Sequence, residues 1–221
     1  MSSMSIIVRE PTEVQARLLQ LNLTVEPLLD VLAHMISHKR GLTLDHPTWM
    51  TGISSAGEGV YMLRTLLRSD GWIREEESSF ELTVYSDGDR DLALNIAKGT
   101  DATGNPDVNV ETAYSRGPQT LQAVQCNNQL MFDIPPPPIA EIEDSLGCNG
   151  RHTWYLLYYV DGNKIRGELS LPLALSAEKH ISEWHERIML PEINIDDHTP
   201  TSAGVVPNES IVVVSRKKRS S

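Results

Sequence analysis

The sequence predicts an α+β protein in which an N-terminal helical layer packs on an antiparallel β-sheet and a hairpin-based β unit follows. Apolar residues recur with a helical period up to about residue 70 and alternate with a period of two afterwards. Four prolines, Pro135 to Pro138, then separate two β-rich regions. Of the 221 residues, 40% are hydrophobic and 22% are charged, which is typical of a globular chain with a buried core.

These signals divide the chain into four parts. Residues 1–134 are expected to form a domain of helices and a β-meander. Residues 135–151 are expected to be a linker, because consecutive prolines stay extended and offer no backbone donors. Residues 152–195 are expected to form a unit of hairpin, helix and strand that either stands alone or merges with the first sheet. Residues 196–221 are expected to be a loose tail with a basic end.

The first two helices have clear boundary residues. Pro11 suits the first turn of a helix, and Val14 and Leu18 lie on one face of it. A second helix follows Thr24, a residue type that caps helices, and Gly41 marks its end. Its apolar positions follow a period of 3.6 residues, as expected for one buried face.

A third helix is expected to begin at Ser55, after a loop over residues 43–54, with Glu58 completing a capping box, and to end at Gly71. Three helices followed by strands also fit a winged helix, a DNA-binding fold whose third helix enters the major groove. In this chain that helix offers only Arg64 and Arg68 for phosphate contact, so this is the second alternative function.

After Gly71 the alternating pattern predicts a meander of short strands, and the segment that follows is ambiguous. Leu92, Leu94 and Ile96 alternate with smaller residues, which gives one face packed on the helices. The expected strands cover residues 72–74, 80–85 and 91–97. A long loop over 98–107, a strand over 108–114 and a helix over 120–127 are expected next.

The clearest local pattern is a hairpin with Gly162-Asn163 at its tip, between strands at 154–160 and 165–171. If the pairing of the two strands shifted by one residue, the apolar side chains of one face would be combined with the more polar side chains of the other. The pattern therefore sets the register. One face carries Trp154, Leu156, Val160, Ile165, Leu169 and Leu171; the other carries Tyr155, Leu157, Tyr159, Arg166, Glu168 and Ser170.

Less regular elements are expected after the hairpin. They are a short helix over 176–186, an edge strand over 187–190 that Pro191 stops, and a second edge strand over 211–214.

The charge argues against nucleic acid as the main partner. The chain has 19 basic and 30 acidic residues, for a net charge of −11. Four of the basic residues are Arg216, Lys217, Lys218 and Arg219, so the rest carries 15 basic against 30 acidic residues, or −15. Because cations dominate phosphate binding, such a chain would be repelled by nucleic acid except at a local patch.

Composition also predicts a location. The longest strongly apolar run, residues 154–160, is far shorter than the roughly 20 residues of a membrane-spanning helix, and the N-terminus has no basic leader. Cys126 and Cys148 are too few for a disulfide framework or a four-thiolate metal site. We therefore expect a cytoplasmic protein in a reducing compartment, with no membrane partner.

No catalytic residues, metal site or cofactor can be assigned from spacing. His34 and His38 are four residues apart on one helix, a metal-binding spacing, but the acidic residue of the zinc-protease pattern is missing between them. His180 and His185 have a poor spacing for one helix face. Cys126 has no neighbouring cation to activate it.

The loop over 98–107 is the candidate ligand site. Glycines let backbone N–H groups approach an anion, Lys98 adds a positive charge, and hydroxyls with aspartates could instead hold a hard cation. The loop is the centre of the first alternative function, an enzyme or a nucleotide- or anion-binding protein; a purely structural turn is the other interpretation. Its candidate ligand-binding residues are Lys98, Gly99, Thr100, Asp101, Thr103, Gly104 and Asp107.

The leading prediction is a non-enzymatic interaction or regulatory protein that binds another protein. Its acidic surface suits a basic or nucleic-acid-binding partner. Tyr155, Tyr159 and Arg166 are the candidate contact residues, because tyrosine and arginine are enriched where interfaces concentrate their binding energy.

Several segments between about residues 23 and 195 resemble an uncharacterised family of bacterial proteins associated with plasmids, prophages and other mobile elements. The resemblance implies a bacterial, cytoplasmic accessory role and supplies no activity, cofactor or site residue. The segments are Thr51-Gly52, Gly57-Glu58-Gly59-Val60, Leu63-Arg64, Gly71-Trp72, Leu82-Thr83-Val84, residues 96–107, Gly117-Pro118, residues 168–172 and Glu186-Arg187-Ile188.

Overall fold

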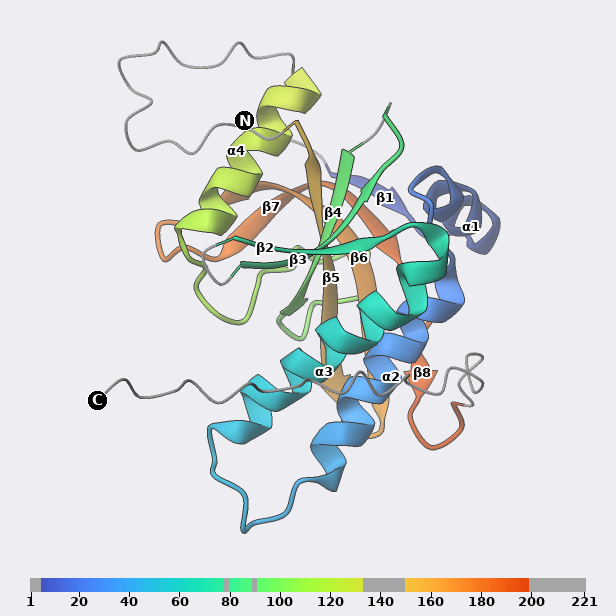
Figure 1. Ribbon diagram of the computed structural model, residues 1–221, viewed down its shortest axis with the longest axis vertical. Coiled ribbons are helices and arrows are strands. Elements are labelled where there is room, and N and C mark those ends of the chain that lie inside the picture. The colour runs from blue at the N-terminus through green and yellow to red at the C-terminus, as the bar shows by residue number, and fades with distance from the viewer. Residues whose placement is uncertain (1–4, 78–79, 89–90, 133–149, 199–221) are drawn as a thin grey trace, which may run out of the picture.

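The computed structural model describes residues 5–77, 80–88, 91–132 and 150–198, and these form an α+β fold around a single mixed sheet (Figure 1). The strands lie in the order β1-β7-β6-β5-β4-β3-β2, and β8 pairs with β6. The helices are α1 (Pro11–Gln20), α2 (Val25–Gly41), α3 (Met50–Leu67), the 3-10 turn η1 (Arg68–Asp70) and α4 (Pro118–Phe132). The strands are β1 (Ile6–Val8), β2 (Ile73–Glu77), β3 (Phe80–Ser86), β4 (Asp91–Lys98), β5 (His152–Asp161), β6 (Lys164–Leu175), β7 (Ile181–Met189) and β8 (Ile193–Asn194).

The N-terminal helical layer is confirmed, and its first two helices keep the predicted boundaries. Pro11 is the first residue of α1, and α2 runs from the residue after Thr24 to Gly41. The Thr24 hydroxyl makes no capping bond, although Thr24 occupies the N-cap position. The buried faces of α1 and α2 join those of the strands in one core that includes Leu18, Leu28 and Leu156.

The start predicted for the third helix is wrong. Helix α3 begins at Met50 rather than Ser55, so the expected loop over 43–54 is shorter. Glu58 completes no capping box, because its carboxylate lies 2.9 Å from His34 Nε2 on α2. The glycines at the predicted start lie inside the helix, where Gly59 lets α3 approach the Met35 side chain closely.

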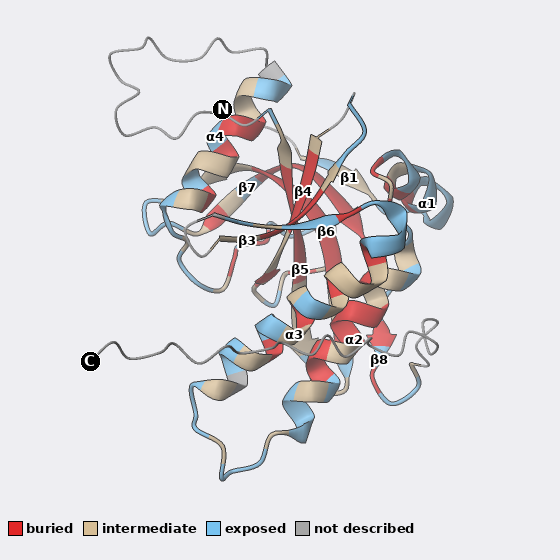
Figure 2. Ribbon diagram, viewed as in Figure 1, coloured by how far each residue is buried: buried red, intermediate tan, exposed pale blue. Residues whose placement is uncertain are grey.

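The hairpin register is confirmed. Val160 pairs with Ile165 and Leu156 with Leu169, as the alternating pattern predicts. The six apolar residues of its first face all belong to or pack against the core beneath α1 to α3. Tyr155 and Leu157 on the other face belong to a second core with Trp184 and Val110. Figure 2 shows buried residues concentrated along the central strands and on the side of α2 that faces them.

The sheet is mixed, which corrects the prediction of an antiparallel sheet. β4 runs parallel to β5 from the Leu92–His152 pair to the Lys98–Tyr158 pair, so the two β units form one sheet. β1 runs parallel to β7 at the opposite side. A parallel connection needs a long crossover, and here it includes α4, which packs on β5 and β6.

Two further predictions of local structure are wrong. Most of the helix predicted over 176–186 and the edge strand over 187–190 belong to the single strand β7, which lies inside the sheet between β1 and β6. Ile181 and Trp184 are buried, and sheet pairing rather than a helix positions them.

The segment over 108–114 forms no regular strand and has only an isolated bridge between Gly99 and Thr112. The helix predicted over 120–127 is confirmed as part of α4. Pro135 to Pro138 and the strand predicted over 211–214 lie outside the described residues.

Candidate functional site: an arginine-lined groove

The loop over 98–107 uses its backbone N–H groups within the protein. Gly99 N donates to the Tyr158 carbonyl (3.0 Å), and Thr100 N to the Glu111 carbonyl (2.9 Å). Thr103 N donates to the Thr100 carbonyl within the loop (3.0 Å). Gly104 N, at a positive φ of 73°, donates to Glu168 Oε2 (2.9 Å). These four donors are therefore not free to cradle an anion, which the prediction for this loop required.

A buried ion pair fastens the same loop to the sheet. Glu168 on β6 and Arg187 on β7 are 0% and 2% exposed, and Arg187 Nη2 lies 2.6 Å from Glu168 Oε2. Arg187 also donates to the carbonyls of Asn105 (3.1 Å) and Val108 (2.9 Å), and the Ser170 hydroxyl donates to Glu168 Oε1 (2.9 Å). Every partner of the pair is thus a protein group, which favours a structural role.

The charged residues of the loop are not gathered into one site. Asp101 and Asp107 are exposed and Lys98 is half-buried at the end of β4. Among the described residues, no group of three or more His, Cys, Asp or Glu side chains is arranged to hold a metal ion.

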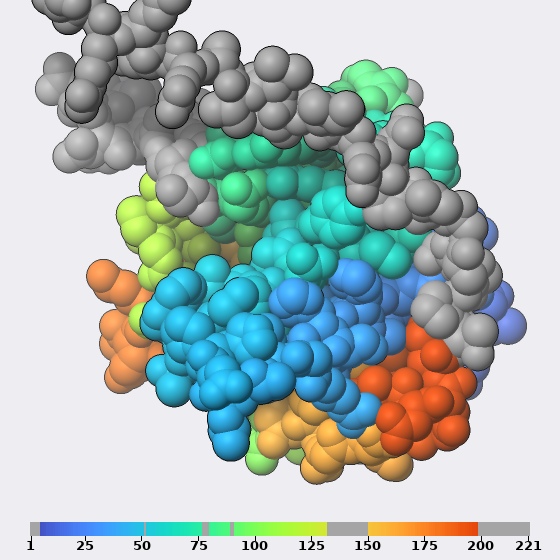
Figure 3. All heavy atoms as spheres, turned by 60° about the horizontal axis from the view of Figure 1, so that its bottom comes forward, coloured from blue at the N-terminus to red at the C-terminus, as the bar shows by residue number. Residues whose placement is uncertain are grey.

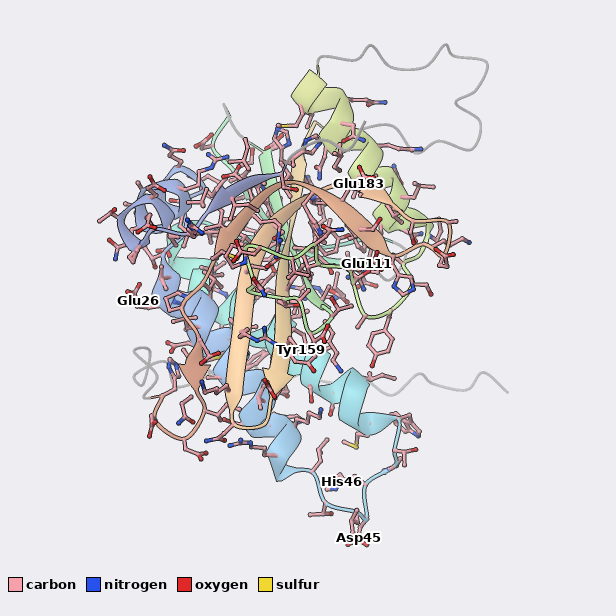
Figure 4. The ribbon with its side chains drawn as sticks, turned by 180° about the vertical axis from the view of Figure 1, so that it is seen from behind. Glu26, Asp45, His46, Glu111, Tyr159 and Glu183 are labelled. Atoms are coloured by element: carbon pink, nitrogen blue, oxygen red, sulfur yellow. The ribbon has the colours of Figure 1, made fainter. Side chains whose placement is uncertain are left out.

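The predicted contact residues differ in accessibility. Tyr155 is fully buried, its hydroxyl donates to Thr120 Oγ1 (3.3 Å), and burial raises its pKa. The prediction that Tyr155 contacts a partner is therefore wrong in this conformation. Tyr159 and Arg166 are half-buried neighbours across the hairpin, with the guanidinium 5.2 Å from the ring centroid, and Figure 4 shows Tyr159 on this face.

Three of the four histidines that spacing singled out have local partners, while His38 Nε2 is buried without a hydrogen-bond partner among the described residues. His34 pairs with Glu58, and His180 Nδ1 donates to the Thr112 carbonyl (2.6 Å). His185 Nε2 donates to Asn128 Oδ1 (2.9 Å). These contacts connect helices and strands within the fold.

Cys126 on α4 is disulfide-bonded, so it offers no nucleophilic thiol. A disulfide is unusual in a reducing compartment, so this bond weighs against the predicted cytoplasmic location.

A groove of about 880 Å³ lies between α3, the strands β2 to β4 and the segment over 115–120. Figure 3 looks onto the side where α3, in cyan, meets the green strands and the yellow-green α4. Along α3, the lining residues Ala56, Val60 and Arg64 recur every four positions, and Arg68 of η1 continues this wall of the groove. One face of the helix therefore forms one wall of the groove.

Four arginines line this groove: Arg64, Arg68, Arg74 and Arg116. Arg64 is partly engaged: its Nη2 donates to Glu81 Oε2 (2.6 Å) and to the Leu82 carbonyl (2.9 Å), while its Nε is buried without a hydrogen-bond partner among the described residues. Glu81 is the single carboxylate among the described residues that line the groove. The groove therefore carries a formal charge of +3 from four arginines and one glutamate, in a chain with a net charge of −11.

Arg116 differs from the other three arginines. Its guanidinium carbon lies 5.4 Å from the centroid of the Tyr155 ring, and its backbone N–H donates to the Lys179 carbonyl (2.8 Å). Its Nε and Nη2 atoms are buried and have no hydrogen-bond partner among the described residues. By contrast, Arg74 is exposed and pairs with Glu76 (2.8 Å), and Arg68 is exposed at the rim.

An unpartnered guanidinium inside a protein is costly. A buried donor without an acceptor loses about 1–3 kcal/mol, and more when the group is charged. The ring of Tyr155 offsets part of this cost through its negative face. Arg116 also lines the groove, so an anionic group there would pair with its charge, and the arrangement suits anion binding.

The sequence contained a weak signal for this site. Arg64 and Arg68 stood out as cations on the third helix, but Arg74 and Arg116 lie on a strand and on a loop before α4, in separate parts of the chain. Only the folded sheet brings the four together. Gly117-Pro118 directly after Arg116 marks a helix start, where anions are favoured, and this signal could have indicated the site.

Comparisons with family models, curated proteins and solved structures find no match to this chain. The resemblance to mobile-element proteins therefore stays a prediction. None of the helices formed by the described residues combines the length and the hydropathy that crossing a bilayer requires.

Proposed function

We propose that this chain is a non-enzymatic binding protein whose groove holds a small organic anion, with Arg116 as the main contact for the anionic group. The observation that carries the proposal is the pair of buried, unpartnered N–H groups on Arg116 in a groove with excess positive charge. A volume of about 880 Å³ lies within the usual range for small-molecule sites.

The lining residues favour binding over catalysis. The described part of the groove contains no histidine or cysteine, and its carboxylate, Glu81, is paired with Arg64. General acid–base catalysis needs a group free to exchange a proton, and arginine stays protonated at neutral pH. A ligand-responsive regulatory protein is consistent with this set of residues.

Calorimetric titration with citrate and with inorganic phosphate tests the proposal. We expect Arg116→Gln to weaken binding of these probes about tenfold or more, because one charge-assisted contact is lost. The matched control is Arg9→Gln, which removes an exposed arginine that pairs only loosely with Glu10 (3.9 Å). If both variants lose affinity equally, or if neither probe binds the wild-type chain, the proposal is wrong.

A second candidate function, binding of a protein partner, is supported by the tip formed by the end of α2 and the start of α3. Leu44, Trp49 and Ile53 are 105%, 66% and 67% exposed there, and Figure 1 shows this helical pair extending beyond the sheet. Large exposed apolar side chains in one region are typical of contact surfaces. Trp49→Ser with Ile53→Ser should abolish a cross-link to the partner in native cells while leaving the melting temperature unchanged.

A further inference from the structure

We infer that the ligand of the groove is a nucleoside monophosphate, with its phosphate on Arg116 and its base between Tyr61 and Phe80. This inference rests on the proposed anion site and adds the chemical class of the ligand. It depends on two features of the groove that a plain anion would not use: an aromatic lining and two amide side chains.

The aromatic lining comes from elements on opposite sides of the groove. Tyr61 lies on α3, is 43% exposed and lines the groove. Phe80 is the first residue of β3 and is half-buried, with part of its ring against the second core. A flat heterocycle placed between two aromatic side chains is stabilised by stacking, whichever base it is.

The amide groups lie beside this aromatic lining. Asn95 Nδ2 donates to the Glu81 carbonyl (2.9 Å), which fixes the side chain and leaves its Oδ1 as an acceptor in the groove. Gln119 lies in the first turn of α4 and lines the same groove. One fixed acceptor and one adaptable amide match the donors and acceptors on the edge of a nucleobase.

The two features line the same groove. Asn95 and Ile96 of β4 line the groove beside Phe80 and Glu81 of β3, while Arg116 and Gln119 line it from the segment that leads into α4. Arg116 is thus three residues from Gln119 along the chain. A ligand with a ring and a phosphate at opposite ends would contact the aromatic pair, the amides and the guanidinium together.

Calorimetric titration with three probes tests the inference: AMP, ribose 5-phosphate and adenosine. We expect AMP to bind about tenfold more tightly than ribose 5-phosphate, because only AMP has a base to stack. Tyr61→Leu should reduce AMP to the affinity of ribose 5-phosphate and leave ribose 5-phosphate unchanged. Tyr61→Phe keeps the ring and should keep the AMP affinity. The matched control is Tyr114→Leu, at an exposed tyrosine outside the groove.

The possible outcomes distinguish the nucleotide inference from the proposed anion site on which it rests. If AMP and ribose 5-phosphate bind equally and Arg116→Gln weakens both, the anion site stands and the nucleotide inference is wrong. If Tyr61→Leu and Tyr114→Leu leave AMP binding equally strong, the inference is also wrong. If no probe binds and citrate fails as well, both are wrong. CMP in place of AMP shows whether the groove prefers a purine.

Discussion

Two arginines show how differently one residue type is used in this fold. Arg187 is almost fully buried, and four protein oxygens accept its hydrogen bonds, so the charge is neutralised within the structure. Arg116 has two buried N–H groups with no acceptor among the described residues. We interpret the first as a structural anchor and the second as a site that a ligand completes.

We predict that Arg187→Met destabilises the fold by about 3–5 kcal/mol, because it leaves the Glu168 carboxylate buried without its partner. The free energy of unfolding in urea measures this loss. Lys164→Met is the control, since it breaks an exposed, solvent-screened pair with Glu192 and should cost far less. Equal losses in the two variants would contradict the anchoring role of Arg187.

Two histidines make stability depend on pH. Burial lowers the pKa of His152, helped by the positive charges of His185 and Arg17, and burial also lowers the pKa of His185. The unfolded chain therefore binds protons that the folded chain does not as pH falls below the ordinary value of 6.5. The free energy of unfolding is therefore highest, as far as these two histidines determine it, above that pH, and it decreases as the pH falls below it.

We predict that the free energy of unfolding decreases between about pH 7.5 and pH 5.5, and that the decrease is smaller when His152→Asn and His185→Gln are combined. Urea unfolding at both pH values measures it. An identical decrease in the wild-type chain and the double variant would show that other groups cause the pH dependence.

The contact between α2 and α3 depends on one glycine of the third helix. A Cβ at Gly59 would overlap the buried Met35 side chain and lie 3.2 Å from Ile96 Cδ1, whereas a Cβ at Gly57 would meet nothing within 4 Å. Both glycines lower helix propensity in the same way. Their environments therefore predict opposite effects of the same substitution.

We predict that Gly59→Ala destabilises the protein by about 1–3 kcal/mol through overpacking. Gly57→Ala should stabilise it by about 0.5–1 kcal/mol, because alanine is the better helix former. Thermal and urea unfolding measure both changes. If both variants are stabilised, α2 and α3 are not packed as closely as the structure has them.

Local patterns predicted some elements well and missed others for physical reasons. The alternation of side chains along the two strands of the hairpin at Gly162 sets its register. Pro11 marks the start of α1, and Gly41 marks the end of α2. The start of α3 was missed because Ser55 and Glu58 mimic a cap inside a longer helix. β7 was missed because pairing with β1 and β6, which lie far away in the sequence, determines its conformation.

The whole molecule is organised by one long-range contact, the parallel pairing of β4 with β5. It joins the meander to the hairpin unit in one sheet across a connection of more than fifty residues, which spans 99–151. Sequence alone left open whether the two units merge, because parallel pairing leaves no local signal. The groove depends on the same sheet, since its arginines come from α3, η1, β2 and the connection before α4.

We predict that the described part of the chain unfolds as one unit. Tryptophan fluorescence reports Trp72 next to the meander and Trp154 in the hairpin unit, and far-ultraviolet circular dichroism reports the helices and sheet. The two urea transitions should coincide, as expected for a single cooperative core. Two separate transitions would show that the β4–β5 pairing does not couple the units.

The most direct test of the anion site is the Nε–H resonance of Arg116 in a ¹H–¹⁵N spectrum, assigned by its loss in Arg116→Lys. Titration with citrate or phosphate should shift this resonance until it saturates, because an anion paired with the guanidinium changes the electrostatic environment of this N–H group. The corresponding resonance of Arg9 should not move. An Arg116 resonance that stays fixed while either anion binds elsewhere would contradict the account.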